Sequence, residues 1–228
     1  MSTKLNKNKI KCAVFDLDGT LLNTIKTINY YLNFALNKNR LGQIDEQSCK
    51  SFVGDGAVKL IHRALKHLDC DRNDLFDIVF ADYNEAYNSD PYYLTEPYEG
   101  ISDTLQALRE CGVKLAVLSN KPNFATRAAV EHFFPSTFDL VYGQREGIPL
   151  KPSPDALLSM LDELSVTPDE VAYIGDSEPD VMTSSNASVS LPISATWGFR
   201  TREQLVFASA ENLIDTPSEI IDLVCRNR

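Results

Sequence analysis

The feature that most constrains this fold is a regular alternation of apolar runs and helix-like segments from residue 100 onward. Runs such as VKLAVL (113–118) and EVAYIG (170–175) are typical of buried strands. The segments between these runs carry apolar residues at helical spacing and are long enough to connect parallel strands. The alternation therefore predicts an α/β fold, a doubly wound, Rossmann-like parallel sheet with helices on both faces.

The first strand of this sheet is expected near the N-terminus, over residues 10–16. Later strands are expected over residues 113–118, 138–143, 170–175 and 189–196, and the segment ENLI (211–214) precedes the last helix. Helices are expected over residues 101–111, 124–133, 154–164, 179–187 and 201–209, with a last helix from Pro217.

Residues 24–90 interrupt the alternation, because they contain no convincing strand. Their apolar spacing predicts four helices, over residues 24–38, 45–53 (with Asp45 as N-cap), 57–68 and 71–87. The segment SDPYYLTEPYEG (89–100) then returns in extended form, because proline and the residue before it disfavour a helix. We expect residues 1–22 and 96–228 to form the core domain and residues 23–95 to form an inserted, all-helical cap domain.

Composition and charge narrow the class of protein. Hydrophobic residues make up 43% of the chain and charged residues 24%, which is ordinary for a globular protein. A net charge of −10 argues against a nucleic-acid partner, since such binding needs an excess of Lys and Arg. No apolar run approaches the ~20 residues of a spanning helix, and the polar N-terminus lacks a signal sequence. We expect a cytoplasmic monomer or homodimer with no membrane partner.

The cysteines are odd in number, scattered and free of CxxC pairing (Cys12, Cys49, Cys70, Cys111 and Cys225). This pattern favours reduced, mostly buried thiols over a disulfide framework or a zinc site.

Polar side chains suited to chemistry follow the expected strands. In open α/β sheets ligands bind at the carboxyl ends of the strands. The residues found there are Asp16 and Asp18, Ser119 and Asn120, Lys151, and Asp176 with Asp180.

This set of side chains is suited to phosphoryl transfer. The carboxylates of Asp16, Asp18 and Asp176 would repel one another without a cation between them, and ligands that offer only oxygen favour Mg²⁺. One aspartate can attack phosphorus and a second can move protons, while Ser119 and Lys151 can hold the transferring oxygens. Each of these short segments, taken alone, could also be an ordinary turn, helix N-cap or surface loop. Their joint placement at strand ends favours a catalytic site.

The motifs DLDGT (16–20), SNK (119–121), KP (151–152) and GDSEPD (175–180) resemble, in order, the four motifs of the haloacid dehalogenase superfamily. The resemblance runs from about residue 10 to the C-terminus, and the helical insertion looks like the family's C1-type cap. Within the superfamily, FVGDGAVKLIHRAL (52–65) and ATWGFR (195–200) resemble phosphoglycolate phosphatases and their close relatives.

The resemblance implies roles for the acidic residues. Asp16 would be the nucleophile and a Mg²⁺ ligand. Asp18 would be the general acid/base and would bind the metal through its backbone carbonyl. Asp176 would complete the metal site, with Asp180 behind it as an orienting residue.

The resemblance also implies how substrate is held. Ser119 and the Asn120 amide would bind the phosphoryl group, and Lys151 would offset charge on the nucleophile and the phosphate. The turn Gly54–Gly56 would be the cap loop facing the active site, or else a plain interhelical turn. Lys59 and Arg63 either meet a substrate carboxylate or lie on a solvated face.

Two positions depart from the family pattern. Asn23 stands where the family often has Asp, and we expect activity to survive because this position is not a metal ligand. Ser188 stands where the family tends to have Gly, which would cost roughly 1 kcal/mol if φ is positive there.

The function expected is a Mg²⁺-dependent phosphatase of a small phosphorylated metabolite, 2-phosphoglycolate or a similar monoester, acting through an aspartyl-phosphate. Other activities of the superfamily stay open: a sugar phosphomutase, a pyrophosphatase, or a phosphonate hydrolase that would use a cap lysine such as Lys59 or Lys66. A non-enzymatic phospho-accepting switch is the alternative from another class. Cap closure is expected to bend residues 22–24 and 95–99.

Overall fold

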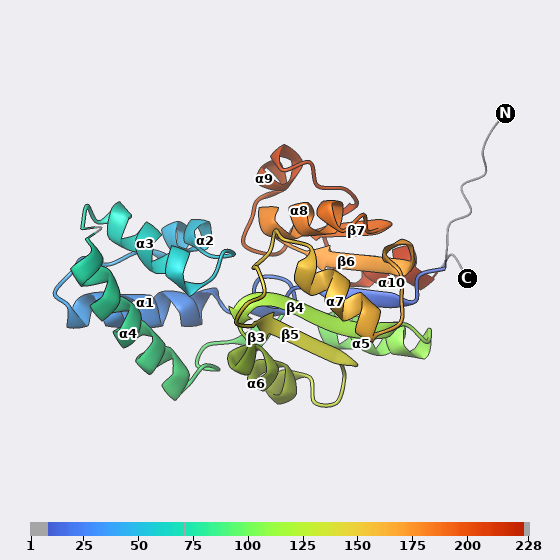
Figure 1. Ribbon diagram of the computed structural model, residues 1–228, viewed down its shortest axis with the longest axis horizontal. Coiled ribbons are helices and arrows are strands. Elements are labelled where there is room, and N and C mark those ends of the chain that lie inside the picture. Colours follow the sequence, from blue (N-terminus) through green and yellow to red (C-terminus); the bar gives the residue numbers. More distant parts are fainter. Residues whose placement is uncertain (1–8, 71, 226–228) are drawn as a thin grey trace.

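The computed structural model describes residues 9–70 and 72–225, and a parallel sheet lies at its centre (Figure 1). The strands run in the order β5 (Leu140–Gln144), β4 (Lys114–Pro122), β1 (Cys12–Phe15), β6 (Val171–Gly175), β7 (Leu191–Ala195) and β8 (Leu213–Ile214). Every pairing in this sheet is parallel. The predicted doubly wound α/β fold is confirmed, with β1 in the interior of the sheet.

Helices cover both faces of the sheet. One face packs on α5 (Ile101–Glu110), α6 (Asn123–Phe133) and α10 (Ser218–Cys225). The other packs on α7 (Asp155–Glu163) and α8 (Glu178–Asn186). The helix α9 (Arg202–Phe207) follows β7, and a short 3₁₀ helix, Pro168–Glu170, precedes β6.

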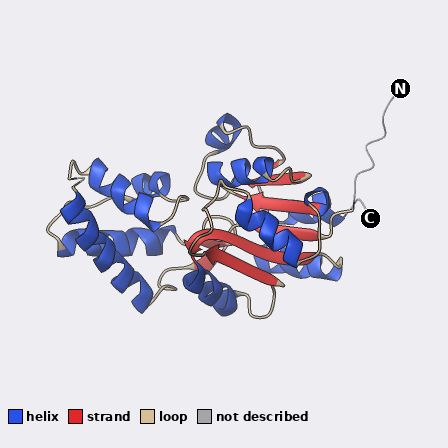
Figure 2. Ribbon diagram, viewed as in Figure 1, coloured by secondary structure: helices blue, strands red, loops and turns tan. Residues whose placement is uncertain are grey.

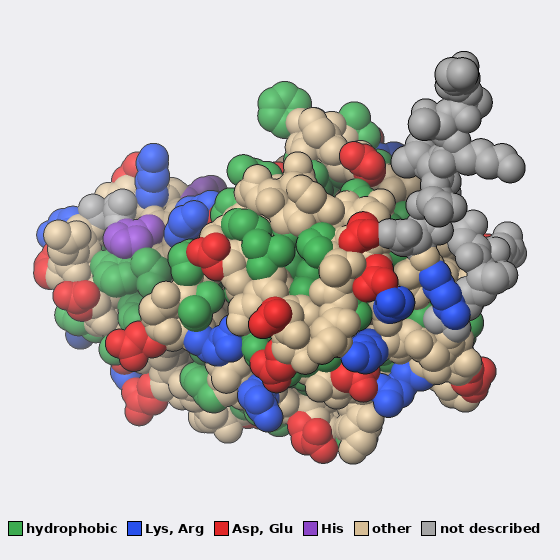
Figure 3. All heavy atoms as spheres, turned by 45° about the vertical axis from the view of Figure 1, so that its right-hand side comes forward, with side chains coloured by type: hydrophobic (Ala, Val, Ile, Leu, Met, Phe, Trp, Pro, Cys, Tyr) green, Lys and Arg blue, Asp and Glu red, His purple; other side chains and the backbone are tan. Residues whose placement is uncertain are grey.

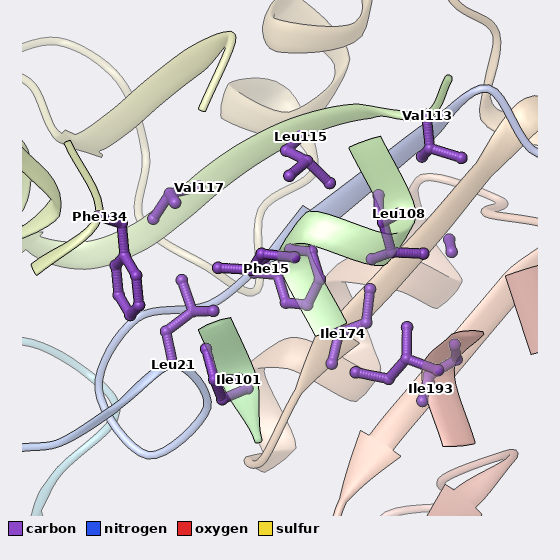
Figure 4. Close-up of a cluster of buried hydrophobic side chains, with 14 of the residues drawn as sticks. Phe15, Leu21, Ile101, Leu108, Val113, Leu115, Val117, Phe134, Ile174 and Ile193 are labelled. Atoms are coloured by element: carbon purple, nitrogen blue, oxygen red, sulfur yellow. The ribbon is translucent and has the colours of Figure 1, made fainter. Parts of the chain in front are cut away.

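The buried positions of β1 alternate between the two faces. Ala13 and Phe15 join the cluster with α5, whereas Cys12 and Val14 join the cluster with α7. Figure 4 shows Phe15 among Ile101, Leu115 and other apolar side chains of the first cluster. Because β1 is buried on both sides, the residues directly after it are held on a fixed backbone.

A separate group of four helices lies beside the sheet (Figures 1 and 2). These are α1 (Ile25–Lys38), α2 (Glu46–Phe52), α3 (Ala57–His67) and α4 (Asn73–Ser89). They share their own buried cluster, as the apolar spacing predicted. The predicted N-cap is confirmed, because the Asp45 side chain accepts a hydrogen bond from the Ser48 N–H. The predicted start of the fourth helix, at residue 71, lies outside the described residues.

Two short strands, β2 (Leu22–Asn23) and β3 (Glu96–Pro97), pair antiparallel where the chain enters and leaves this helical group. The sequence analysis did not predict them, because two residues are too short for any periodicity. They coincide with the segments where we expected hinges. The side-chain oxygen of Asn23 is buried there and has no hydrogen-bond partner among the residues that the structure describes.

The prediction that all the cysteines are reduced is wrong. Cys111, at the end of α5, and Cys225, at the end of α10, form a disulfide with their Cα atoms 6.3 Å apart. The sequence could not reveal this pair, because only the packing of α5 on α10 brings these distant positions together. Cys12, Cys49 and Cys70 are free.

Acidic and basic side chains are interspersed on the face shown in Figure 3. Among the helices that the structure describes, none has both the length and the apolar content needed to cross a membrane.

Candidate active site

The residues singled out from the sequence lie together at the carboxyl end of the sheet. Asp16 and Asp18 directly follow β1, and Asp176 directly follows β6. Ser119 and Asn120 lie near the end of β4. Lys151 lies in the loop after β5 and Asp180 in the first turn of α8. The parallel sheet thus gathers at one edge groups that are far apart in the sequence.

Three buried carboxylates form a compact cluster. One oxygen from each of Asp16, Asp176 and Asp180 lies within 4.8 Å of the others. The predicted set included Asp18, but the carboxylate of Asp18 belongs to a different ion pair. This arrangement leaves the main-chain carbonyl of Asp18 for the predicted metal contact.

Lys151 is the cation that this cluster holds directly. Its ammonium nitrogen lies 2.9 Å from Asp16 Oδ1 and 2.6 Å from Asp180 Oδ1. Burial raises the pKa of Asp16 well above its ordinary value, the negative charge of Asp180 raises it further, and Lys151 opposes both. Burial by itself would lower the pKa of Lys151, but Asp16 and Asp180 raise it well above its ordinary value, so the lysine stays charged.

Asp180 is held from several sides, as expected for an orienting residue. Besides Lys151, its carboxylate accepts hydrogen bonds from the hydroxyls of Tyr173, at 3.0 Å, and Ser177, at 2.5 Å. Gly175 is needed beside it, because a Cβ there would lie 2.3 Å from the Cβ of Asp180.

Asp176 carries the uncompensated charge of the cluster. It accepts hydrogen bonds from the Thr20 hydroxyl (2.9 Å) and the Phe199 N–H (2.8 Å), both neutral donors. Burial and, after it, the negative charge of Asp180 raise the pKa of Asp176 to about 7, against the lowering effect of the two hydrogen bonds. No ion pair to Asp176 is found among the described residues, so one buried carboxylate lacks a cation.

These observations fit a bound Mg²⁺. A hard divalent cation takes oxygen ligands, and the cluster offers carboxylate oxygens with a net deficit of positive charge. Asp16 and Asp176 could hold it, as predicted, beside the third carboxylate of the cluster, Asp180.

Lys121 is a site residue that the sequence analysis noted but gave no role. Its ammonium group lies 3.1 Å from both carboxylate oxygens of Asp18. It also lies 4.8 Å from the ring centre of Tyr87, in α4. The only sequence signal was its place in the SNK motif.

The side chain of Asn120 has a structural task. Its amide group donates to the carbonyls of Gly54 (3.0 Å) and Lys151 (3.1 Å), and its oxygen accepts from the Lys151 N–H (2.9 Å). The side-chain amide of Asn120 is therefore already engaged, and the main-chain N–H is the group of Asn120 that could make the predicted phosphoryl contact. Ser119 lines the cavity between the sheet and the helical group, and its hydroxyl oxygen accepts from the Lys121 N–H at 3.3 Å.

A cavity of about 470 Å³ separates the sheet edge from the helical group. Asp16, Asp18 and Ser119 line its floor, and the loop Gly54–Gly56 lines its opposite side. Of the two interpretations of this loop, the structure favours the one in which it faces the active site.

Lys59 and Arg63 were expected either to meet a substrate carboxylate or to lie on a solvated face. In the structure both pair with Asp55. Lys59 Nζ lies 3.1 Å and Arg63 Nη2 lies 2.5 Å from the Asp55 carboxylate. Arg63 also donates to the carbonyl of Phe52 at 2.7 Å. Neither cation lines the cavity; both hold the loop that does.

The loop 196–200 connects the carboxylate cluster to the helical group. The Phe199 N–H binds Asp176, while the Phe199 ring packs in the buried cluster of α1–α4. Arg200 donates to the carbonyls of Lys50 (2.6 Å) and Val53 (2.8 Å) and pairs with Glu178 at 2.7 Å. The sequence analysis had quoted ATWGFR as a resemblance but had assigned no role to Phe199 or Arg200.

A doubly wound sheet with a carboxylate cluster at its strand ends and a helical group over that edge defines a class of hydrolase. A family model described as haloacid dehalogenase-like hydrolase matches residues 13–192. The chain belongs to this family.

Several curated proteins that this chain resembles are named phosphoglycolate phosphatase. The chain is 27% identical over 225 residues to that of Vibrio vulnificus (strain YJ016), a match that covers 96% of this chain and 98% of the relative. It is 34% identical over 186 residues to that of Rhodospirillum rubrum, covering 78% and 77% of the two chains. A solved structure from Lactobacillus delbrueckii subsp. bulgaricus, whose description also names phosphoglycolate phosphatase, superposes with a TM-score of 0.90 at 32% identity over 95% of this chain and 99% of that one.

Proposed function

We propose that this protein is a Mg²⁺-dependent phosphatase of small phosphate monoesters that works through an aspartyl-phosphate on Asp16. The observation that carries the proposal is the position of Asp16, on the floor of the cavity and beside Lys151 within a cluster that is short of positive charge. Bound Mg²⁺ would neutralise charge on the phosphoryl oxygens and on the carboxylates of Asp16 and Asp176.

Asp16 has one oxygen in position to attack. The hydrogen bond from the Leu17 N–H (2.7 Å) and the ion pair with Lys151 both end on Oδ1, which leaves Oδ2 for phosphorus. In the first step the Oδ2–P bond forms and the bond from phosphorus to the ester oxygen breaks. Asp18, which is ion-paired with Lys121 in the substrate-free protein and must take up a proton before this step, gives that proton to the leaving oxygen.

The second step releases phosphate. A water molecule gives a proton to Asp18 and attacks phosphorus, and the bond between phosphorus and Asp16 breaks. The Ser119 hydroxyl, the main-chain N–H of Asn120 and the Lys151 ammonium group would hold the phosphoryl oxygens through both steps. Asp18 thus begins and ends the cycle with the same proton count.

The test is phosphate release from a panel of small monoesters with and without Mg²⁺, using 2-phosphoglycolate as the reference because the relatives carry its name. Asp16→Asn should abolish turnover and leave the fold intact, whereas the matched variant of an exposed aspartate, Asp162→Asn, should behave as wild type. Turnover that survives in Asp16→Asn, or that does not depend on Mg²⁺, would contradict the proposal.

The cap lysines that a phosphonate hydrolase would need do not reach the site. Lys59 is turned toward Asp55, and Lys66 is exposed on α3. Neither lines the cavity where substrate would bind. The geometry therefore favours a phosphatase over a phosphonate hydrolase.

We further propose that residues 23–95 move as a cap on the hinge formed by β2 and β3. A crosslink between residues 22–24 and 95–99 should then suppress turnover, and unchanged turnover in the crosslinked protein would count against cap motion.

A further inference from the structure

We propose that the leaving-group half of the cavity accepts an uncharged group with an apolar surface, larger than glycolate, and that 2-phosphoglycolate itself is a poor substrate. This inference rests on the proposed phosphatase function, and it deepens that function by naming the substrate class. The basis is the charge and the lining of the 470 Å³ cavity.

The cavity offers no free cation to a second anionic group on the substrate. Its charged lining residues, among those that the structure describes, are Asp16, Asp18, Asp55 and Lys121. Lys121 is already paired with both oxygens of Asp18, and its side chain is only 8% exposed. A carboxylate on the substrate would have to compete with Asp18 for this ammonium group.

The charged residue on the cap side is itself a carboxylate. Burial would raise the pKa of Asp55, but hydrogen bonds from Arg63 and Lys59 outweigh it and lower the pKa, so Asp55 stays ionised. Those two cations are committed to Asp55 and lie behind it, outside the lining. An anionic leaving group would therefore meet a like charge.

The remaining walls are apolar or neutral. Leu60, Phe80 and Tyr83 line the cavity from the cap, and Phe124 and Leu150 line it from the sheet domain. Hydrogen-bonding capacity comes from uncharged amides, chiefly those of Asn84, Asn88 and Gln144. In the conformation described, before the cap motion proposed above, the volume lies in the range of roughly 300–1,000 Å³ typical of sites for drug-sized ligands, which is far more than glycolate fills.

These surroundings favour one kind of leaving group. An apolar face of the leaving group would gain binding free energy when it is buried against the aromatic and aliphatic side chains. A few hydroxyl or amide groups on the leaving group could form hydrogen bonds with the side-chain amides. A carboxylate would lose hydration without gaining a partner, at a cost equivalent to roughly tenfold or more in affinity.

The experiment compares four esters that differ separately in charge and in size. The small pair is 2-hydroxyethyl phosphate and 2-phosphoglycolate; the large pair is benzyl phosphate and 4-carboxybenzyl phosphate. We expect kcat/KM to be roughly tenfold or more higher for the neutral member of each pair, and highest of all for benzyl phosphate. A preference for either carboxylate, or for 2-hydroxyethyl phosphate over benzyl phosphate, would overturn the inference.

Two variants test the lining directly. Asn84→Lys places a cation on the cap wall and should raise kcat/KM for 2-phosphoglycolate, relative to 2-hydroxyethyl phosphate, by roughly tenfold; Asn84→Gln should keep the wild-type order of substrates.

Phe124→Ala should lower kcat/KM for benzyl phosphate by roughly fivefold, and that for 2-hydroxyethyl phosphate less. Phe207→Ala, which removes a phenylalanine that is 94% exposed on α9, is the matched control. If the Asn84 and Phe124 variants leave these ratios unchanged, the lining does not select the substrate.

Failure of the inference is distinguishable from failure of the proposed function. If none of the four esters releases phosphate, the proposed function fails for this class of substrate. Binding of the same esters to the Asp16→Asn protein with Mg²⁺, measured by calorimetry, still reports the preference for charge and size. Equal or tighter binding of the carboxylate esters would overturn the inference in that case too.

Discussion

The ammonium group of Lys121 lies 3.1 Å from both carboxylate oxygens of Asp18, so the proposed proton carrier is held in a bidentate ion pair. The side chains are 8% and 15% exposed. Lys121 also contacts the ring of Tyr87 in α4. One lysine thus connects the sheet edge to the helical group and fixes the carboxylate that must reach the leaving oxygen.

Lys121→Met should therefore impair chemistry more than binding. Without its partner, the Asp18 carboxylate is free to rotate away from the leaving oxygen, and we expect kcat to fall by roughly 10- to 100-fold with little change in KM. Steady-state kinetics on a reactive monoester measures this, with a melting curve to confirm folding. Lys66→Met, which removes an exposed lysine that lies outside the cavity, should retain kcat. A variant in which KM rises while kcat stays unchanged would show that Lys121 binds substrate instead.

Arg200→Ala should loosen the contact between the helical group and the sheet domain. Arg200 is 7% exposed, and its loss leaves the carbonyls of Lys50 and Val53 without their donor. We expect the free energy of unfolding to fall by about 2–4 kcal/mol and hydrogen exchange to accelerate in α2 and the following loop.

Arg202→Ala is the matched control for this prediction. Arg202 forms an exposed pair with Asp215, and removing such a pair should cost less than about 1 kcal/mol. Equal losses in the two variants would mean that Arg200 is not an anchor.

Gly198→Ala should displace Asp176 and weaken Mg²⁺ dependence. A Cβ at Gly198 would lie 2.3 Å from the Cβ of Asp176 and 2.5 Å from both Asp176 Oδ2 and the Gly19 carbonyl, so one of these groups must move. We expect the Mg²⁺ concentration for half-maximal activity to rise by roughly 10- to 100-fold. Gly147→Ala, at a glycine with positive φ but open space around it, should leave that concentration unchanged even if stability falls slightly. An unchanged Mg²⁺ requirement in Gly198→Ala would argue against Asp176 as a ligand.

Ser188→Gly should stabilise the protein. Ser188 follows α8 with φ at 55°, the left-handed conformation that the sequence comparison with the family had suggested. Because glycine adopts this conformation without the Cβ penalty, the free energy of unfolding should rise by about 1 kcal/mol. Denaturant unfolding measures it. Ser185→Gly, at an exposed position inside the same helix, should lower stability by about 0.5–1 kcal/mol, and a gain in both variants would refute the backbone explanation.

The order and type of most helices and strands could be read from the sequence. After residue 100 the helices and strands are short, and each is specified by the apolar spacing of its own residues. The elements β6 and α5–α8 therefore lie within a residue of the predicted bounds, whereas β4 starts as predicted but continues four residues further, to Pro122. The pairs β2–β3 and Cys111–Cys225 could not be predicted, because each joins segments that meet only in the folded chain.

The candidate site also has features that the sequence predicts and features that it does not. Asp16, Asp18 and Asp176 could be placed at one edge, because parallel strands bring their carboxyl ends together whatever the loops do. The partner that each carboxylate takes could not be predicted, and the prediction of a cluster that includes the Asp18 carboxylate shows why. Asp18 pairs with Lys121, a residue 103 positions away, and Asp180 takes the place in the cluster.

By itself, the sequence determined the parallel sheet, the inserted helices and the chemical types gathered at the strand ends, since these depend on local periodicity and on strand direction. Only the tertiary structure decided which charges are compensated, whether a cation in the cavity lining is left unpaired, and where Arg200 and Phe199 meet the helical group. Those properties depend on distances of a few ångströms between segments far apart in the chain, and the energy of a charge pair changes steeply over such distances.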